Sequence, residues 1–120
     1  MSWELKLPYQ KPPLSLNTRM HWAPKAKLTR ELRDTAHVLA KAARIPKQQA
    51  IILTLHYVPR QNRRRDPSNL LGTQKPLLDG LVDAGIIPDD CPPYVEERMP
   101  VIHAASKSPA MWLEIQPKGN

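Results

Sequence analysis

Apolar residues recur along the chain in short runs that predict strands. Residues 3–7 alternate between apolar and polar side chains, and residues 50–58 read AIILTLHYV, a run rich in β-branched residues. Both patterns are typical of strands. Residues 95–102 and 111–115 have the same character and predict two more. Pro100 interrupts the third of these four segments, which predicts a short strand or an edge strand, because proline donates no backbone hydrogen bond.

A helical spacing of apolar positions replaces this pattern over residues 26–44. One apolar stripe runs along the segment and predicts a helix that ends before Pro46, because the residue before a proline avoids helical angles. Lysine and arginine occupy the other faces, as either a solvated surface or a contact to DNA. The stripe consists of Leu28, Leu32, Ala36, Leu39 and Ala43, and the basic positions are Lys27, Arg30, Arg33, Lys41 and Arg44.

A second helix is predicted over residues 74–84. Thr73 is a suitable N-cap, and Pro76 would then fall in the first turn, where its missing N–H costs little. Gly85 is suited to the left-handed position that closes a helix. Apolar residues would face the core, and three charged residues spaced four apart would share the opposite side: Lys75, Asp79 and Asp83.

The order strand, helix, strand, helix, strand, strand predicts an α+β fold. We expect a single small domain over residues 1–120, with a mixed four-stranded sheet and two helices packed on it. A chain of this length buries a modest fraction of its surface, so association into a homodimer would add to its stability.

Charge is distributed unevenly along the chain. Residues 1–65 hold fourteen basic and three acidic residues, a balance of +11, whereas residues 66–120 hold four basic and eight acidic residues, a balance of −4. A basic half attracts polyanions, above all nucleic acid. Clustered carboxylates repel phosphate, so the acidic half requires a separate explanation.

Cysteine content and the first residues indicate the cellular setting. The single cysteine, Cys91, permits no internal disulfide and no cysteine-rich zinc site. The first residues contain no long apolar run, so we expect no signal peptide and no membrane span. The sequence predicts a soluble, cytoplasmic protein.

Candidate chemistry surrounds the second predicted helix. The stretch "NRRRDPSN" places three arginines directly before Asp66, and "AGIIPDD" places Asp89 and Asp90 after the helix. A helix of about eleven residues spans roughly 16 Å, so the two acidic sites either stay apart or converge through their loops. Converging carboxylates would be stabilised by Mg²⁺ or Mn²⁺, which prefer oxygen ligands. Taken alone, the aspartate pair is also typical of a solvated turn.

The same residues resemble a known family. "RRRDPSN" followed by "KPLLDGLVDAGIIPDD" is similar to the RusA family of Holliday junction resolvases, small dimeric endonucleases of phages and prophages. The resemblance covers residues 60–91 well, and "PPLSLNTRMHW" resembles the start of the family pattern more loosely. It implies a RusA-like homodimer in a bacterial host cell that binds branched DNA and resolves four-way junctions by paired nicking.

The resemblance also implies roles for individual residues. Asp66, Asp90 and Lys75 would be catalytic, and Asp66, Asp90 and Asp89 would bind Mg²⁺, with Mn²⁺ as a substitute. Lys75 would stabilise the charge of the transition state. Water would be the nucleophile. The predicted DNA contacts are Arg63, Arg64, Arg65 and Asn69, with Arg19 and Lys27 from the basic half.

Two positions depart from the family pattern. Ser68 stands where the family carries a second aspartate, and "LLGTQ" lengthens the segment between Asn69 and Lys75 by about three residues. A non-catalytic, dimeric DNA-binding protein with a weakened metal site is therefore the alternative hypothesis. A third hypothesis is a metal-dependent phosphatase or nucleotide hydrolase. The charge of +11 argues against it, since a small substrate requires no broad basic surface.

Overall fold

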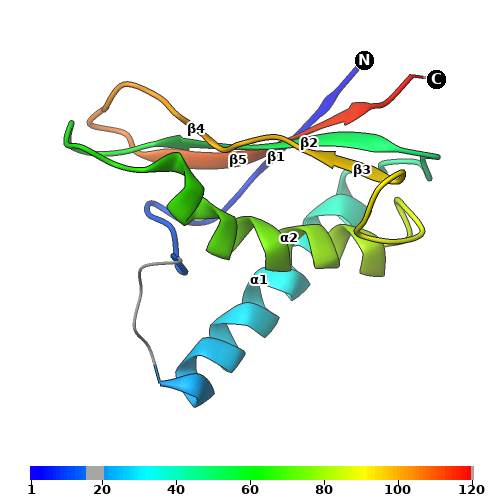
Figure 1. The fold of residues 1–120 in the computed structure, drawn as a ribbon, viewed down its shortest axis with the longest axis horizontal. Coiled ribbons are helices and arrows are strands. Elements are labelled where there is room, and N and C mark those ends of the chain that lie inside the picture. Colours follow the sequence, from blue (N-terminus) through cyan, green and yellow to red (C-terminus); the bar gives the residue numbers. More distant parts are fainter. Residues whose placement is uncertain (16–20, 120) are drawn as a thin grey trace.

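Strands and helices follow the predicted order in a computed structural model, which describes residues 1–15 and 21–119 (Figure 1). A mixed sheet and two α-helices form a small α+β domain. A short 3₁₀ helix, η1, leads directly into the second α-helix. The elements are β1 (Trp3–Lys6), α1 (Trp22–Ala42), β2 (Ile51–Val58), η1 (Pro67–Leu70), α2 (Leu71–Asp83), β3 (Val95–Glu97), β4 (Val101–Ile102) and β5 (Ala110–Pro117).

Strand β2 lies at the centre of the sheet. It pairs with β5 in antiparallel orientation and with β3 and β4 in parallel orientation, and β1 pairs with the far side of β5. The predicted mixed sheet is confirmed, but it has five strands in place of four. The segment 95–102 is divided into β3 and β4 at residues 98–100, which include Pro100. Both strands pair with β2 at the edge of the sheet, where the missing N–H of proline interrupts no central strand.

The two faces of the sheet differ in character. Along β2, Ile51, Leu53, Leu55 and Tyr57 are buried and point toward the helices, because side chains of a strand alternate between faces. Both helices lie on this one side of the sheet (Figure 1). The opposite face bears polar and aromatic side chains, among them His56 beside Trp112 of β5.

The helices stack in order of distance from the sheet. Helix α2 lies next to the sheet, and α1 crosses α2 on its far side, while its first turns extend away from the sheet (Figure 1). The helix crossing is close at Gly80: a Cβ atom there would lie 2.2 Å from the Arg33 carbonyl oxygen and 2.7 Å from Ala36 Cβ. The prediction that both helices pack on the sheet therefore holds for α2, whereas α1 packs chiefly on α2.

Helix α1 begins four residues before the predicted position and ends two residues earlier. It closes with Arg44 in a left-handed conformation (φ 55°), so that the Arg44 N–H donates to the Lys41 carbonyl and the Ile45 N–H donates to the Ala40 carbonyl. This arrangement is the Schellman motif, in which glycine is the usual residue. The helix therefore ends at this motif, before the chain reaches Pro46.

Helix α2 begins earlier than predicted, and the predicted N-cap is wrong. Residues 67–70 already form η1, so Thr73 lies inside the helix, fully buried, and Pro76 lies in its second turn. The Thr73 hydroxyl donates to the Leu14 carbonyl (2.5 Å) and accepts from the Leu14 N–H (3.3 Å). The predicted cap at Gly85 is confirmed, because its φ is 79°. The N–H groups of Gly85 and Ile86 donate to the carbonyls of Val82 and Leu81, which forms a second Schellman motif.

The helices also bear on the membrane prediction. In the part of the chain that the structure describes, no helix combines the length and the apolar character that crossing a bilayer requires.

Candidate functional site

The arginine run leaves the end of β2 and enters η1 through Asp66. The Asp66 carboxylate accepts a hydrogen bond from the Ser68 N–H (2.9 Å), and Pro67 occupies the first position of η1, where it sacrifices no bond. The hydrogen bond from the Ser68 backbone, followed by that from the Ser68 side chain, lowers the pKa of Asp66 below its ordinary value of 3.8. The exposed carboxylate is therefore ionised at neutral pH.

The arginines and Asp66 line one concavity, here named the arginine pocket. It has a volume of 510 Å³, and Tyr57 forms part of its wall. The Arg65 guanidinium lies 5.9 Å from the centre of the Tyr57 ring, and its Nη1 donates to the Gln61 carbonyl (2.7 Å), which orders this side chain. Its polar and charged lining consists of Lys11, Ser15, Tyr57, Arg63, Arg64, Arg65, Asp66 and Asn69.

A second group of charges forms where the loop after α2 curls back along the helix. The Lys75 ammonium donates to Asp79 Oδ1 (3.2 Å), one turn further along α2, and to Asp90 Oδ2 in the loop. About half of the Lys75 side chain remains exposed. This Lys75 cluster brings together two residues predicted to be catalytic, Lys75 and Asp90.

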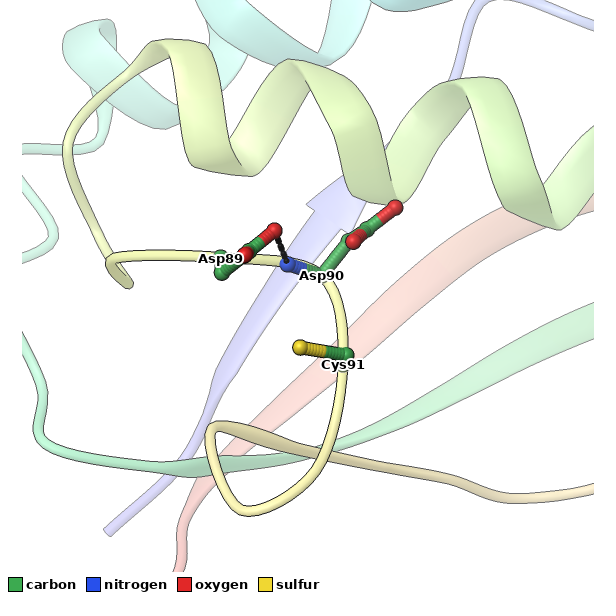
Figure 2. A group of neighbouring side chains, drawn as sticks. All are labelled: Asp89, Asp90 and Cys91. Atoms are coloured by element: carbon green, nitrogen blue, oxygen red, sulfur yellow. Dashed lines mark hydrogen bonds between the residues drawn. The ribbon is translucent and has the colours of Figure 1, made fainter.

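Asp89, Asp90 and Cys91 offer three potential metal ligands in the same loop. One ligand atom from each lies within 4.8 Å of the others, and Asp90 points toward α2 in Figure 2. Asp89 Oδ1 accepts the Asp90 N–H (2.8 Å), which fixes the turn. Two carboxylates fit a hard divalent cation, whereas a thiolate suits a softer one. The ammonium of Lys75 already compensates part of the Asp90 charge.

The structure distributes the predicted site residues over two places. Asp66 is not part of the 89–91 group; it lies in the arginine pocket with Asn69 and the three arginines. Nine positions along η1 and α2 separate Asp66 from Lys75. Lys27 is exposed on α1. Arg19 lies outside the described residues.

Two contributions were not predicted from the sequence. Lys11 and Tyr57 line the arginine pocket, although one follows β1 and the other lies in β2. The bonds between Thr73 and Leu14 hold the segment after Lys11 against α2. The positive charge of Lys11 is visible in the sequence and makes it a candidate for phosphate binding, but no local pattern connects Lys11 with residues 63–66.

Comparison with known proteins adds a distant relative. The chain is 32% identical over 85 residues to an uncharacterized protein of Xylella fastidiosa (strain Temecula1 / ATCC 700964). The match covers 67% of this chain and 56% of the relative, so the chain spans about half the length of the protein it matches. No family model matches the chain.

Proposed function

We propose that this protein is a metal-dependent endodeoxyribonuclease that binds branched DNA and resolves four-way junctions by paired nicking, acting as a homodimer. The observation that carries the proposal is the contact of Lys75 with Asp90, beside Asp89, on the helix that follows η1 and the arginine run in the chain. Phosphate binding requires basic side chains, whereas binding of a divalent cation requires carboxylates. This chain carries both kinds of side chain on η1, α2 and their adjoining loops.

Each group of residues has a physical role in this proposal. Arg63, Arg64 and Arg65 bind backbone phosphates and set the position of the strand. Asp89 and Asp90 hold the divalent cation, which supplies Lewis-acid stabilisation of the charge on the phosphate. Lys75, with half of its side chain exposed, orients Asp90 and contributes positive charge beside the scissile phosphate. Asp66 remains a predicted ligand, supplied from the arginine pocket.

A synthetic four-way junction with labelled strands tests the proposal. With Mg²⁺ or Mn²⁺, we expect paired nicks in opposed strands. We expect Asp90→Asn to lower the nicking rate by at least about a hundredfold, because the variant loses a carboxylate that would hold the cation. Asp34→Asn, an exposed acid on α1 outside both groups, is the matched control. Nicking by Asp90→Asn at the wild-type rate would refute the assignment of the site.

One observation favours the alternative, a non-catalytic DNA-binding dimer. The position where the family carries a second aspartate is Ser68, and its N–H and hydroxyl hold Asp66 in a cap. The Asp66 carboxylate thus already has partners in its own loop. Binding of the junction without nicks, at every metal concentration tried, would support this alternative.

Ser68→Asp separates the two possibilities further. A second carboxylate beside Asp66 raises the local negative charge, so we expect Mn²⁺ affinity to rise by about tenfold, measured by titration calorimetry. The control is Ser2→Asp, an exposed serine before β1 that belongs to neither group. An unchanged affinity would show that the region of Asp66 takes no part in binding the cation.

A further inference from the structure

Three concavities adjoin one another at the end of the sheet where β2 finishes and β5 begins. The arginine pocket shares Lys11, Tyr57, Arg63 and Arg65 with a second pocket of 420 Å³, which also includes Arg60. The second shares Gln10 and Pro109 with a third pocket of 620 Å³, which extends to Trp112. We call the three together the basic trough.

Charge in the basic trough is strongly positive. Among its lining residues, the acids are Glu4 at one end and Asp66 at the other. Six basic side chains line the path between and around them: Lys6, Lys11, Arg60, Arg63, Arg64 and Arg65. A polyanion fits this distribution, whereas a neutral or cationic ligand does not.

The far end of the trough offers an aromatic surface that is held in place. Trp112 and His56 are direct partners across β5 and β2, with ring centres 4.9 Å apart and planes inclined by 3°. Both nitrogens of the His56 ring are engaged, Nε2 with Glu114 (2.9 Å) and Nδ1 with His103 (2.9 Å), so the ring does not turn freely. The imidazole therefore fixes the indole plane.

His103 also stacks on the indole, with ring centres 5.2 Å apart, and its ring lies 5.1 Å from that of His56, so both imidazoles lie on the same side of Trp112. Strand β5 lies between β2 and β1, and the partner of Trp112 across β1 is Lys6. The side of the indole toward β1 therefore faces Lys6 and the third pocket, which both residues line. An aromatic face beside an ammonium, at the end of a row of arginines, is the arrangement on which single-stranded nucleic acids bind by stacking and charge.

We infer that the basic trough holds a single-stranded DNA segment, with its phosphates on the arginines and one base stacked on Trp112. The inference rests on the proposed function only in taking DNA as the polyanion. Its consequence is that the protein engages a branched substrate through an unpaired arm or an unpaired stretch at the branch. In a continuous duplex the bases are paired and do not reach the indole.

Fluorescence of Trp112 tests the inference directly. In a Trp3→Phe/Trp22→Phe background, Trp112 is the remaining tryptophan. With EDTA present, we expect an oligo(dT) of about twelve nucleotides to quench its emission, since single-strand sites span about 4–16 nucleotides. A blunt duplex of equal length, or an abasic strand with the same phosphates, should bind without quenching. Equal quenching by the duplex, or none by oligo(dT), would overturn the inference.

Charge variants test the path of the strand. We expect Arg60→Ala or Lys11→Ala to weaken oligo(dT) binding about threefold to tenfold at low salt, because each loses a phosphate contact. Lys47→Ala, an exposed lysine before the other end of β2 and outside the trough lining, should change it less than about twofold. Circular dichroism confirms that each variant is folded. Equal losses for Arg60→Ala and Lys47→Ala would mean nonspecific attraction and would refute the trough.

Two further comparisons separate this inference from the proposed function. Tighter binding of oligo(rU) than of oligo(dT) would assign the trough to RNA and overturn its assignment to a DNA arm. Quenching by oligo(dT), with no nicking of junctions in Mg²⁺, would retain the trough and refute the nuclease. Nicking that persists while oligo(dT) leaves Trp112 emission unchanged would refute the trough and retain the nuclease.

Discussion

At the scale of single residues, the charged side chains of this protein are divided between structure and chemistry. The sequence predicts that Arg33 belongs to the basic face of its helix, as a solvated residue or a DNA contact. It instead makes two hydrogen bonds to Asp83 of α2, with distances of 2.5 and 2.8 Å. Lys75 contacts Asp79 within α2 and Asp90 in the loop after it. The Arg33–Asp83 and Lys75–Asp90 pairs each hold α2 to a neighbouring segment, but Lys75 remains accessible at a potential reaction site.

The Arg33–Asp83 pair predicts a pH dependence of stability. The hydrogen bond from Arg33 lowers the pKa of Asp83 below its ordinary value of 3.8. A lowered folded-state pKa stabilises the fold above that ordinary value, and the contribution is lost as the pH falls through the lowered pKa. Because both side chains are partly exposed, we expect Asp83→Asn to cost about 0.5–1 kcal/mol at neutral pH.

Urea unfolding at two pH values checks this prediction. At neutral pH the variant should be less stable than the wild type, and well below pH 3.8 the two should converge, because the wild-type carboxyl is then protonated. Glu31→Gln, an exposed acid of α1 outside this pair, serves as the control. A difference between Asp83→Asn and wild type that is as large in acid as at neutral pH would contradict an ionic origin.

At the scale of elements, the ends of the helices decide where the site residues lie. Asp66 starts η1, η1 continues into α2, and Gly85 ends α2 and turns the chain back toward Lys75. Asn69 belongs to η1 and lines the arginine pocket, whereas Lys75 belongs to α2 and contacts Asp90 in the loop after that helix.

The end of α1 offers a test of the Schellman motif. Arg44 adopts a φ of 55°, which costs a residue with a Cβ about 1 kcal/mol relative to glycine. We therefore expect Arg44→Gly to raise the free energy of unfolding by about 0.5–1 kcal/mol. Lys41→Gly, within the last turn of the same helix, should lower it by about 1 kcal/mol. Thermal unfolding measures both, and a loss of stability in Arg44→Gly would contradict the assignment.

The crossing of α1 and α2 leads to a prediction of the opposite sign. Gly80→Ala would place a methyl group 2.2 Å from the Arg33 carbonyl oxygen, so the helices would have to separate. We expect a loss of about 2 kcal/mol or more in unfolding free energy, since overpacking outweighs the helix propensity gained. Gly119→Ala, where no atom lies within 4 Å of the added group, should be neutral. Stability unchanged in Gly80→Ala would show that the helices cross less closely.

At the scale of the whole molecule, the uneven charge along the sequence becomes a surface with two regions. The arginines, Lys11 and Lys6 gather in the basic trough, and the acids Asp89 and Asp90 lie beyond Lys75 on the neighbouring loop. The basic side chains of the trough would neutralise several phosphates of a bound DNA strand at once. Its affinity should then fall steeply with salt, because bound counterions are released on binding.

Junction affinity as a function of salt measures this effect. If about four phosphates are contacted, affinity should fall roughly a hundredfold between about 50 and 200 mM salt, and Arg64→Ala should reduce the slope by about one. Lys47→Ala, at the other end of β2, should leave the slope unchanged. A flat dependence would refute phosphate binding by the trough.

Sedimentation equilibrium on the same samples tests the predicted homodimer, for which we expect twice the mass of the chain.

Sequence by itself determined the elements, their order and the α+β class, because alternation and helical spacing are local consequences of burial on one face. It also determined which residues are candidates, since charge and residue type are visible without a structure. Only the tertiary structure decided the division of the edge strand, the true start of α2, the meeting of Lys75 with Asp90, and the grouping of Asp66 with Lys11 and Tyr57. These features depend on contacts between segments far apart in the chain, and no local periodicity encodes such distances.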